Sequence, residues 1–594
     1  MRINQLGVVL PSLAALFLMA GCASGPQHAP DRSATHAKPQ KSHKAAPAVA
    51  PGQRLDWPLL PAPRQADINT PQPAFELAPG DVAVDGNGLS SEQQEKIRRF
   101  VLGALQSLPS RADKAAPQAS VKVDAAAAPH AQGYDLAIGP SGVRITAHDE
   151  AGVFYAAQTI RQIAQQARAS GVLPLAHVVD WPDFPNRGVM LDVARDKVPE
   201  METLYALVDK FASWKLNQLQ LYTEHTFSYR NHPTVWQDAS PMTAHQIQEL
   251  DKYCRERYIE LVPNQNSFGH MGRWLQHPQY KHLGEMPGGG GDLCPVDPDC
   301  VIIMNHKELI PELPKDVVAM EWGYEAKHPF LEHGKIFASS GISYYVVPGT
   351  SSWNSLVGRT DNAVANLRNA GENGLANGAI GYLITDWGDG GHWQCLPISY
   401  LGFAYGAAVS WCVQTNAGAD IPRILDAYAF EDEAGVMGKL AYDLGNAYQK
   451  TGITPGNNTT FYGLLLHCTE KPFSKSFLKT LSAKDMEETL AYVDEVMARL
   501  PNARMKTSDA QLIRDEFAVD ANLARFACHL GIARAKAGGV ATSALPRDVR
   551  SRLAAELAPI IPQYRQLWLA RNRSGGLKES AGAMENLLAL LKAN

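Results

Sequence analysis

The chain has 594 residues, a length that suggests three or four domains rather than one. Its 45% of hydrophobic residues and 19% of charged residues are typical of a globular protein with a sizeable core. The formal net charge is −5 and the sequence contains no basic stripe, so we expect no nucleic-acid partner.

The N-terminus has the pattern of an export signal. In residues 1–22 a single Arg is followed by an apolar run, too short to span a membrane in the mature protein, and then by small residues before Cys22. The segment LMAGC is similar to a bacterial lipobox, which predicts an outer-membrane lipoprotein anchored through Cys22 and facing the periplasm or the cell surface. A plain cleaved signal peptide is the alternative. Residues 23–55, rich in Ala, Pro, His, Lys and Ser, are predicted to be a disordered linker.

Seven cysteines remain after Cys22, and an odd number leaves at least one of them free. Cys294 and Cys300 are close enough in sequence for a small loop disulfide. No CxxC pair occurs, so the pattern indicates neither a structural zinc site nor a thioredoxin-type centre. His277 and His282 are interpreted as surface residues, and we predict no metal and no cofactor.

Residues 56–180 are predicted to form a small α+β domain. A capped amphipathic helix is expected at 90–109 and a second helix at 150–170. Between them, 134–149 reads as two alternating strands around a Gly-containing turn, which predicts a hairpin.

From residue 186 onward, strands alternate with helices, which predicts a parallel sheet with helices outside it. The expected strands are 188–194, 216–223, 259–264, 317–322, 342–348 and 379–385. Most of them end in polar or aromatic clusters, as expected at the active face of a (β/α)8 (TIM) barrel. The predicted fold class is therefore α/β, with a barrel-type domain at 181–415 followed by a helical domain at 416–594.

The predicted barrel is incomplete. Six strands are clear where a closed barrel needs eight, and the segment VIIM at 301–304 would add a seventh. The gap lies between the strand that ends at 264 and the strand that begins at 317. About two βα units of roughly 30 residues each are expected to be missing there.

Long motifs in this part of the chain resemble family 20 glycoside hydrolases, the β-N-acetylhexosaminidases. They include YDLAIGPSGVRITAHD, NRGVMLDVARDKVP, IELVPNQNSFGHMGRWL and TDWGDGGHWQ, and the likeness covers about residues 130–415. The resemblance implies a hydrolase acting on terminal N-acetylglucosamine or N-acetylgalactosamine of a glycan. In this family the acetamido oxygen of the substrate itself is the nucleophile of a retaining hydrolysis.

The family's chemistry also implies a carboxylate pair after the fourth barrel strand, in which a Glu protonates the leaving oxygen and an adjacent Asp orients the acetamido group. The Asp-Glu dipeptides of this chain begin at Asp149, Asp432, Asp494 and Asp515, none at a predicted barrel strand end. The last three are interpreted as solvated helix faces. We therefore name no catalytic residue, and we expect strand four, its carboxylates and most of strand five to be missing at a join near Cys300.

Five residues near strand ends are candidates for binding or structure. Arg187 matches a family Arg that binds sugar hydroxyls, and its fork of donors suits that role, with an ion pair to Asp192 as the alternative. Asp192 and Arg195 are interpreted as a structural ion pair. Glu224 is expected at the active face, and His270 matches a loop His of the family, with a structural role as the alternative.

Four tryptophans follow strand ends: Trp322, Trp353, Trp387 and Trp393. Sugars present apolar C–H faces that stack on aromatic rings, so we predict a sugar-binding wall, although core packing is the ordinary role of a single Trp. Asp389 occupies the place of an acidic residue that binds outer hydroxyls in the family, and Asp386 is the alternative.

Two functions follow from these residues. The first is a β-N-acetylhexosaminidase-type glycosidase with little or no turnover, and the second is a non-catalytic lipoprotein that binds amino-sugar glycans. A deleted version of a full enzyme is a third interpretation. None of the four nearby carboxylates is expected to replace the missing acid, which must reach the glycosidic oxygen. They are Glu321, Glu325, Asp297 and Asp299.

Overall fold

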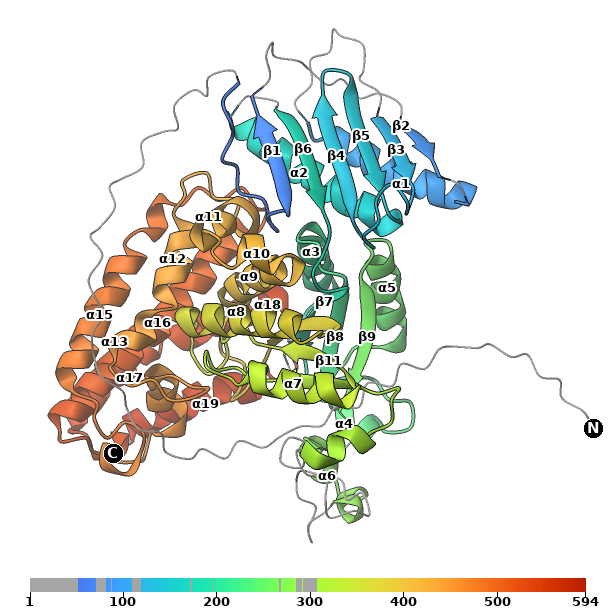
Figure 1. Ribbon diagram of the computed structural model, residues 1–594. Coiled ribbons are helices and arrows are strands. Elements are labelled where there is room, and N and C mark those ends of the chain that lie inside the picture. Colours follow the sequence, from blue (N-terminus) through green and yellow to red (C-terminus); the bar gives the residue numbers. More distant parts are fainter. Residues whose placement is uncertain are drawn as a thin grey trace, which may run out of the picture.

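The computed structural model of the protein describes residues 52–70, 82–86, 88–108, 119–170, 174–195, 197–266, 269–284, 291 and 307–593. Figure 1 shows a sheet at the top of the view, a parallel sheet with helices in the middle, and a group of helices at the left. The predictions for Cys22, for the disulfide between Cys294 and Cys300 and for the strand at 301–304 fall outside the described residues.

The upper sheet is formed by the N-terminal part of the chain. Its strands are β1 (Gln65–Asn69), β2 (Val82–Asp85), β3 (Ala119–Val123), β4 (Tyr134–Gly139), β5 (Gly142–Ala147) and β6 (Leu175–Asp180), in the order β1-β6-β4-β5-β3-β2. Residues 52–55, assigned to the linker from their composition, are ordered. The amides of Gly52 and Leu55 donate to the carbonyls of Thr70 and Ile68.

Two helices cover this sheet, at the positions that the sequence predicts. They are α1 (Ser91–Leu105) and α2 (Glu150–Ser170), and α2 packs against β4 and β5. Ser90 and Gln93 form a capping box at the start of α1, which satisfies backbone amides that a helix leaves open at its first turn. The predicted hairpin is confirmed, because β4 and β5 pair antiparallel from Tyr134↔Ala147 to Gly139↔Gly142.

The described residues form a middle sheet of six parallel strands, at the positions of the six clear strands that the sequence predicts. They are β7 (Asn186–Asp192), β8 (Gln218–Thr223), β9 (Glu260–Gln265), β10 (Val318–Trp322), β11 (Ser343–Val347) and β12 (Gly381–Asp386). Their order is β10-β11-β12-β7-β8-β9, so the last strand in sequence pairs with the first, as in a closed barrel.

In the part of the chain that the structure describes, the barrel is open between β9 and β10. Within the described residues, β9 pairs only with β8 and β10 only with β11. A (β/α)8 barrel would place its fourth and fifth strands between these two. The incomplete barrel predicted from the strand count is confirmed, with the opening at the predicted place.

Helices pack on the outside of this sheet. Those that follow its strands are α3 (Met201–Ser213), α5 (Ala244–Arg255), α7 (Phe330–Ser340), α8 (Thr360–Ala376) and α9 (Tyr400–Trp411). Short helices α4 (Pro233–Trp236) and α6 (Gly272–Leu275) lie in the segments after β8 and β9. All twelve residues of α9 are buried, because this helix lies between the parallel sheet and the C-terminal helices.

The C-terminal region is helical, as predicted. Its helices are α10 (Val413–Asn416), α11 (Ile421–Ile424), α12 (Met437–Leu444), α13 (Ala447–Lys450), α14 (Thr460–Tyr462), α15 (Ala483–Met497), α16 (Ala510–Lys536), α17 (Arg547–Leu557), α18 (Ile560–Arg571) and α19 (Leu577–Lys592). A buried ion pair joins two of them, with Arg571 donating to both carboxylate oxygens of Glu516 at 2.7 and 2.8 Å.

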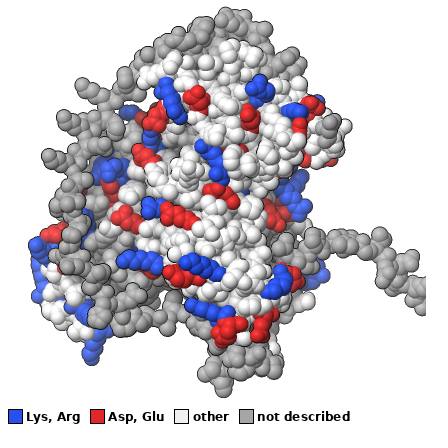
Figure 2. Space-filling model, viewed as in Figure 1, with Lys and Arg blue, Asp and Glu red and all other residues white. Residues whose placement is uncertain are grey.

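The surface carries charges of both signs. Figure 2 shows acidic and basic side chains interspersed over the face in view. Across the described part of the chain, no helix is both long enough and apolar enough to cross a lipid bilayer.

Candidate functional site

The candidate site lies on the inner face of the parallel sheet, near the carboxyl ends of its strands. Side chains of this face form an apolar cluster separate from the main core, with Met190, Tyr222, Trp353, Leu383 and Trp387 among its members. In (β/α)8 barrels this end of the strands carries the active site.

Arg195 follows β7 and stands at the centre of an ion-pair cluster. Its Nη1 lies 3.0 Å from Asp192 Oδ2 and 3.8 Å from Glu224 Oε1, and its Nη2 lies 3.2 Å from Asp389 Oδ1. Burial lowers the pKa of Arg195, but the three carboxylates together raise it above its ordinary value. The predicted ion pair between Asp192 and Arg195 is confirmed, and the cluster presents donors and acceptors of the kind that bind sugar hydroxyls.

Glu224 follows β8 and is brought next to His270. The hydroxyl of Tyr222 donates to Glu224 Oε1 at 2.9 Å and accepts from Asn266 Nδ2 at 2.8 Å. His270 Nδ1 lies 3.8 Å from the same Glu224 oxygen. Burial and the charge of Glu224 raise the pKa of Tyr222, so its hydroxyl stays a donor at neutral pH.

Three of the four predicted tryptophans lie on this face. The indole of Trp387 donates to the Tyr324 hydroxyl at 2.8 Å, and its ring meets Tyr222 edge-on at 4.9 Å between centroids. Trp322 stacks on Tyr324 at 5.3 Å, and Trp353 meets the Tyr324 ring edge-on at 5.1 Å. The rings of Trp322, Tyr324 and Trp387 form a contiguous aromatic surface beside the ion-pair cluster, since Arg195 lies 5.2 Å from the Trp387 ring. Trp353 is fully buried behind them, and its indole donates to the Asn457 side chain at 2.8 Å.

Trp393 is not part of this surface, and its predicted role is corrected. It is fully buried, its indole donates to the Ser580 carbonyl at 3.0 Å, and its ring packs on Tyr462 at 5.2 Å. Trp393 therefore anchors the segment after β12 to the C-terminal helices.

Arg187 is also placed away from the site. It lies at the start of β7, at the opposite end of the strand from Arg195, and is fully buried. Its guanidinium donates to the carbonyls of Lys215 and Phe184 and to the Tyr155 hydroxyl, at 3.1, 2.7 and 3.2 Å. Its donors are used inside the protein, so the sugar-binding prediction is corrected to a structural role.

Of the two aspartates considered at the end of β12, Asp389 faces the site. Burial and Asp192 raise the pKa of Asp389, while Arg195 lowers it, and the net shift is upward. Asp386 is buried and accepts hydrogen bonds from the hydroxyls of Thr350 and Ser352, both at 2.7 Å, and from Ser399. Asp386 therefore holds the ends of β11 and β12 together.

Neither Glu321 nor Glu325 offers a carboxylate for proton transfer at this face. Glu325 forms a two-point ion pair with Arg359, at 3.0 and 2.7 Å. Glu321 lies on β10 and is hydrogen-bonded by two histidines from the outer side of the sheet. Burial raises the pKa of Glu321, but these hydrogen bonds outweigh burial and the pKa is lowered.

The Asp-Glu dipeptides of the chain lie outside the parallel sheet, as predicted. Asp149 precedes α2, and Asp494 lies in α15 in an ion pair with Arg525. The interpretation as solvated helix faces is wrong for Asp432 and Glu516, which are 5% and 2% exposed because they bond inside the C-terminal region.

Sequence reasoning did not place Arg195, Tyr222 or Tyr324 among the candidate binding residues. Arg195 lies just beyond the end of β7, and a position after the carboxyl end of a barrel strand is the signal for a functional role. Tyr222 and Tyr324 give a weaker signal, since an aromatic residue in or after a strand is ordinary core material.

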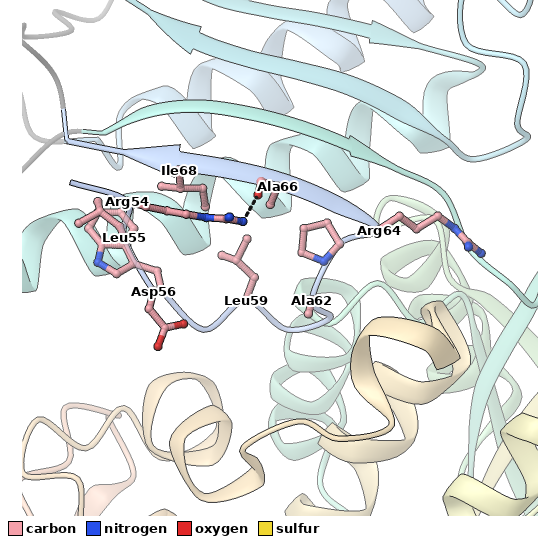
Figure 3. Close-up of a pocket in the computed structure, with 10 residues that line it drawn as sticks. Arg54, Leu55, Asp56, Leu59, Ala62, Arg64, Ala66 and Ile68 are labelled. Atoms are coloured by element: carbon pink, nitrogen blue, oxygen red, sulfur yellow. Dashed lines mark hydrogen bonds between the residues drawn. The ribbon is translucent and has the colours of Figure 1, made fainter. Parts of the chain in front are cut away.

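One cavity lies far from these strand ends. It has a volume of about 470 Å³ and is lined by residues 54–68 of the N-terminal region (Figure 3). Arg54 donates to the Ala66 carbonyl across it at 3.1 Å. The cavity has no contact with the ion-pair cluster, so it forms no part of the candidate site.

The fold and the candidate site together define a (β/α) barrel that is open on one side within the described residues, with charged and aromatic groups at its strand ends. A model of "Glycosyl hydrolase family 20, domain 2" matches residues 56–181, and one of "Glycosyl hydrolase family 20, catalytic domain" matches residues 184–289. Together these two family 20 matches cover most of residues 56–289 of the chain. The catalytic-domain match ends at 289, before β10 begins at Val318.

Named relatives are similar over part of the chain. An N,N'-diacetylchitobiase of Vibrio harveyi is 38% identical over 89 residues, which is 15% of this chain and 10% of that protein. A beta-hexosaminidase of Akkermansia muciniphila is 28% identical over 156 residues, or 23% of this chain and 31% of that protein. The chain thus spans less than a third of each relative.

A solved structure with a related description is the GH20 exo-β-N-acetylglucosaminidase of Vibrio harveyi in complex with N-acetylglucosamine. It aligns with a TM-score of 0.47 and 14% identity, covering 64% of this chain and 79% of that one.

Proposed function

We propose that the protein is a glycoside hydrolase of β-N-acetylhexosaminidase type whose inner sheet face receives a terminal N-acetylglucosamine or N-acetylgalactosamine. The observation that carries the proposal is the cluster of Arg195 with Asp192, Glu224 and Asp389 beside the Trp387 ring. Charged groups fix sugar hydroxyls and an aromatic ring accepts the apolar sugar face. The matches to two family 20 models over residues 56–181 and 184–289 support the choice of an acetylated amino sugar.

We propose that turnover by this chain is slow. The family's mechanism needs an adjacent Asp and Glu after the fourth strand, and the sequence from Asn264 to Ala379 contains no Asp-Glu dipeptide. A general acid contributes roughly 10²–10⁴-fold to rate, and the amide-orienting Asp is lost with it. The retained cluster would then bind the sugar without breaking its bond efficiently.

An aryl N-acetylglucosaminide assay tests the catalytic part of this proposal. We expect the purified protein to release nitrophenol at a rate at least about 10²-fold below that of a complete family enzyme assayed alongside, which is the lower bound for losing a general acid. Release at the rate of the complete enzyme would show that another carboxylate in the chain acts as the acid.

A non-catalytic role in binding amino sugars is the second candidate, and the opening of the sheet between β9 and β10 favours it. Calorimetry with N-acetylglucosamine and its oligomers tests binding directly. Trp387→Ala should abolish the heat, whereas Trp57→Ala, in the N-terminal region, serves as the matched control and should leave it unchanged. Absence of heat with the folded wild-type protein would count against both candidate functions.

We further propose that the protein is exported and anchored as an outer-membrane lipoprotein through Cys22. The supporting observation is the sequence of residues 1–22, with its apolar run and the segment LMAGC. Cys22→Ser should release the protein from the membrane fraction of a bacterial host. Retention of the variant in that fraction would contradict the anchor.

A further inference from the structure

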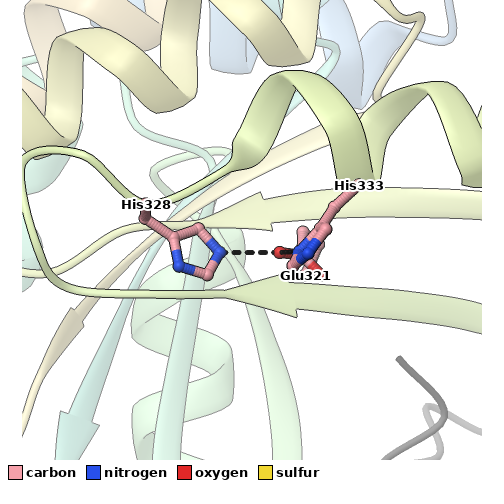
Figure 4. A group of neighbouring side chains, drawn as sticks. All are labelled: Glu321, His328 and His333. Atoms are coloured by element: carbon pink, nitrogen blue, oxygen red, sulfur yellow. Dashed lines mark hydrogen bonds and ion pairs between the residues drawn. The ribbon is translucent and has the colours of Figure 1, made fainter. Parts of the chain in front are cut away.

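Three side chains that can bind a metal ion meet on the outer side of the parallel sheet. Figure 4 shows Glu321 on β10 facing His328, which precedes α7, and His333 in the first turn of α7. Glu321 Oε1 lies 2.7 Å from His328 Nε2 and 2.6 Å from His333 Nδ1. The three possible ligand atoms all lie within 4.8 Å of one another, so two imidazole nitrogens and one carboxylate oxygen converge on one point.

The backbone that carries His328 is held by a row of asparagines on α8. The side-chain amide of Asn362 donates to the Tyr324 carbonyl at 2.7 Å, and that of Asn366 donates to the Gly323 carbonyl at 2.8 Å. The amide of Asn369 donates to the His328 carbonyl itself at 2.8 Å. Such support fixes a ligand in place before an ion binds, which is a requirement of an effective metal site.

We propose that Glu321, His328 and His333 bind a divalent zinc ion. Two histidines and one carboxylate are a set of three ligands that suits Zn²⁺, with water at the fourth position. Ligand bonds of about 2.0–2.1 Å in a tetrahedron place ligand atoms about 3.3 Å apart, so the present atoms need to separate by only about 0.6 Å. The side chains are 5%, 19% and 17% exposed, which leaves the two imidazoles accessible to an entering ion.

The place of the site in the fold gives the ion a structural role. β10 is an edge strand of the open barrel and pairs on one side, with β11, in the described residues. Zinc held between Glu321 on this strand and His333 on α7 would fasten the edge strand to its helix. The next residue, Trp322, carries part of the aromatic surface on the inner face, so the ion would also steady that surface.

The test uses the full chain without a polyhistidine tag, stripped with a chelator and titrated calorimetrically with ZnCl₂. The variants are Glu321→Gln and His333→Gln, and the control is His245→Gln, which removes an exposed histidine paired with Glu249 on α5. Circular dichroism establishes that each variant is folded. The linker also contains His28, His36 and His43, so the quantity of interest is the binding that is lost in the site variants.

We expect the wild type and the control to bind one equivalent of zinc. Each site variant should bind zinc about 100-fold more weakly or not at all, because losing a ligand costs more affinity than losing the outer-shell partner of a ligand. Zinc should raise the melting temperature of the wild type but not of the site variants. In the wild type, Co²⁺ should give the intense visible absorption of a four-coordinate site. Equal binding by wild type and site variants would overturn the proposal, as would a wild type that binds no zinc. If the site variants fail to fold, a wild type without the Co²⁺ absorption would overturn it.

Discussion

Replacing Arg195 with Met would remove the one cation at the centre of three carboxylates. Asp192 is fully buried and Glu224 is 8% exposed, whereas Asp389 is 33% exposed and Arg195 itself 21% exposed. Loss of one partner of a buried ion pair costs roughly 3–5 kcal/mol. Because part of this cluster reaches solvent, we expect a loss of about 3 kcal/mol in the free energy of unfolding, at the lower end of that range.

The assay is thermal unfolding followed by circular dichroism. At roughly 2–4 °C per kcal/mol, the variant should melt about 6–12 °C below the wild type in the transition that includes the parallel sheet. Arg565→Met is the matched control, since its pair with Glu585 is 35% and 48% exposed and should contribute only about 0–1 kcal/mol. A melting temperature of Arg195→Met equal to that of the control would refute the reasoning.

The pH dependence gives a second test of the same cluster. Without Arg195, burial and the charge of Asp192 act unopposed on Asp389, which raises the pKa of Asp389 in the folded state further above its unfolded value. The folded variant then takes up protons more readily than the unfolded chain, so its stability falls as pH rises. The difference in the free energy of unfolding between the wild type and Arg195→Met should therefore become smaller as the pH falls from 7.5 to 5. A difference that grows on acidification would contradict this reasoning.

Three other predictions concern a buried tryptophan, the buried thiols and the peptide at the gap in the barrel. Trp393→Ala should destabilise the protein by about 3–5 kcal/mol, since it empties a fully buried site, whereas Trp387→Ala should cost less; equal melting temperatures of the two would contradict the assignment. Burial raises the pKa of Cys254 and Cys528 to about 12, so alkylation of the native protein mapped by mass spectrometry should spare the buried thiols until unfolding, and rapid native labelling would contradict their burial. These thiols are Cys254, Cys395, Cys412, Cys468 and Cys528. Peptide mapping should find residues 294–305 as one stretch of the printed sequence, and a longer stretch would show that the missing strands are present in the natural protein.

The strands of the barrel could be predicted from the sequence because parallel strands are buried on both faces and read as short apolar runs. β12 is buried at all six positions, and the polar cluster after it marks the strand end. The strand count also located the opening, since a barrel has a fixed number of strands.

The site residues were harder to predict because their roles depend on long-range contacts. Arg187 lies at the start of β7 and Arg195 just beyond its end, so only the direction of the strand separates the structural arginine from the one at the active face. Trp393 follows a strand end like Trp387, but it is buried by a contact with Ser580 on α19, far along the chain. No local pattern reports such a contact.

The residues of the proposed zinc site could not be predicted from the sequence either. Glu321, His328 and His333 have no spacing that marks a metal site, and they meet only because α7 folds back over β10. The fold, rather than the spacing, creates this group of ligands.

An experimental structure with N-acetylglucosamine bound would test the central claim most directly. We expect six parallel strands open between β9 and β10, with the sugar ring against Trp387 and its hydroxyls on Arg195 and Asp389. A closed sheet of eight strands with an Asp-Glu pair over the sugar, or a sugar bound away from these three residues, would contradict the account.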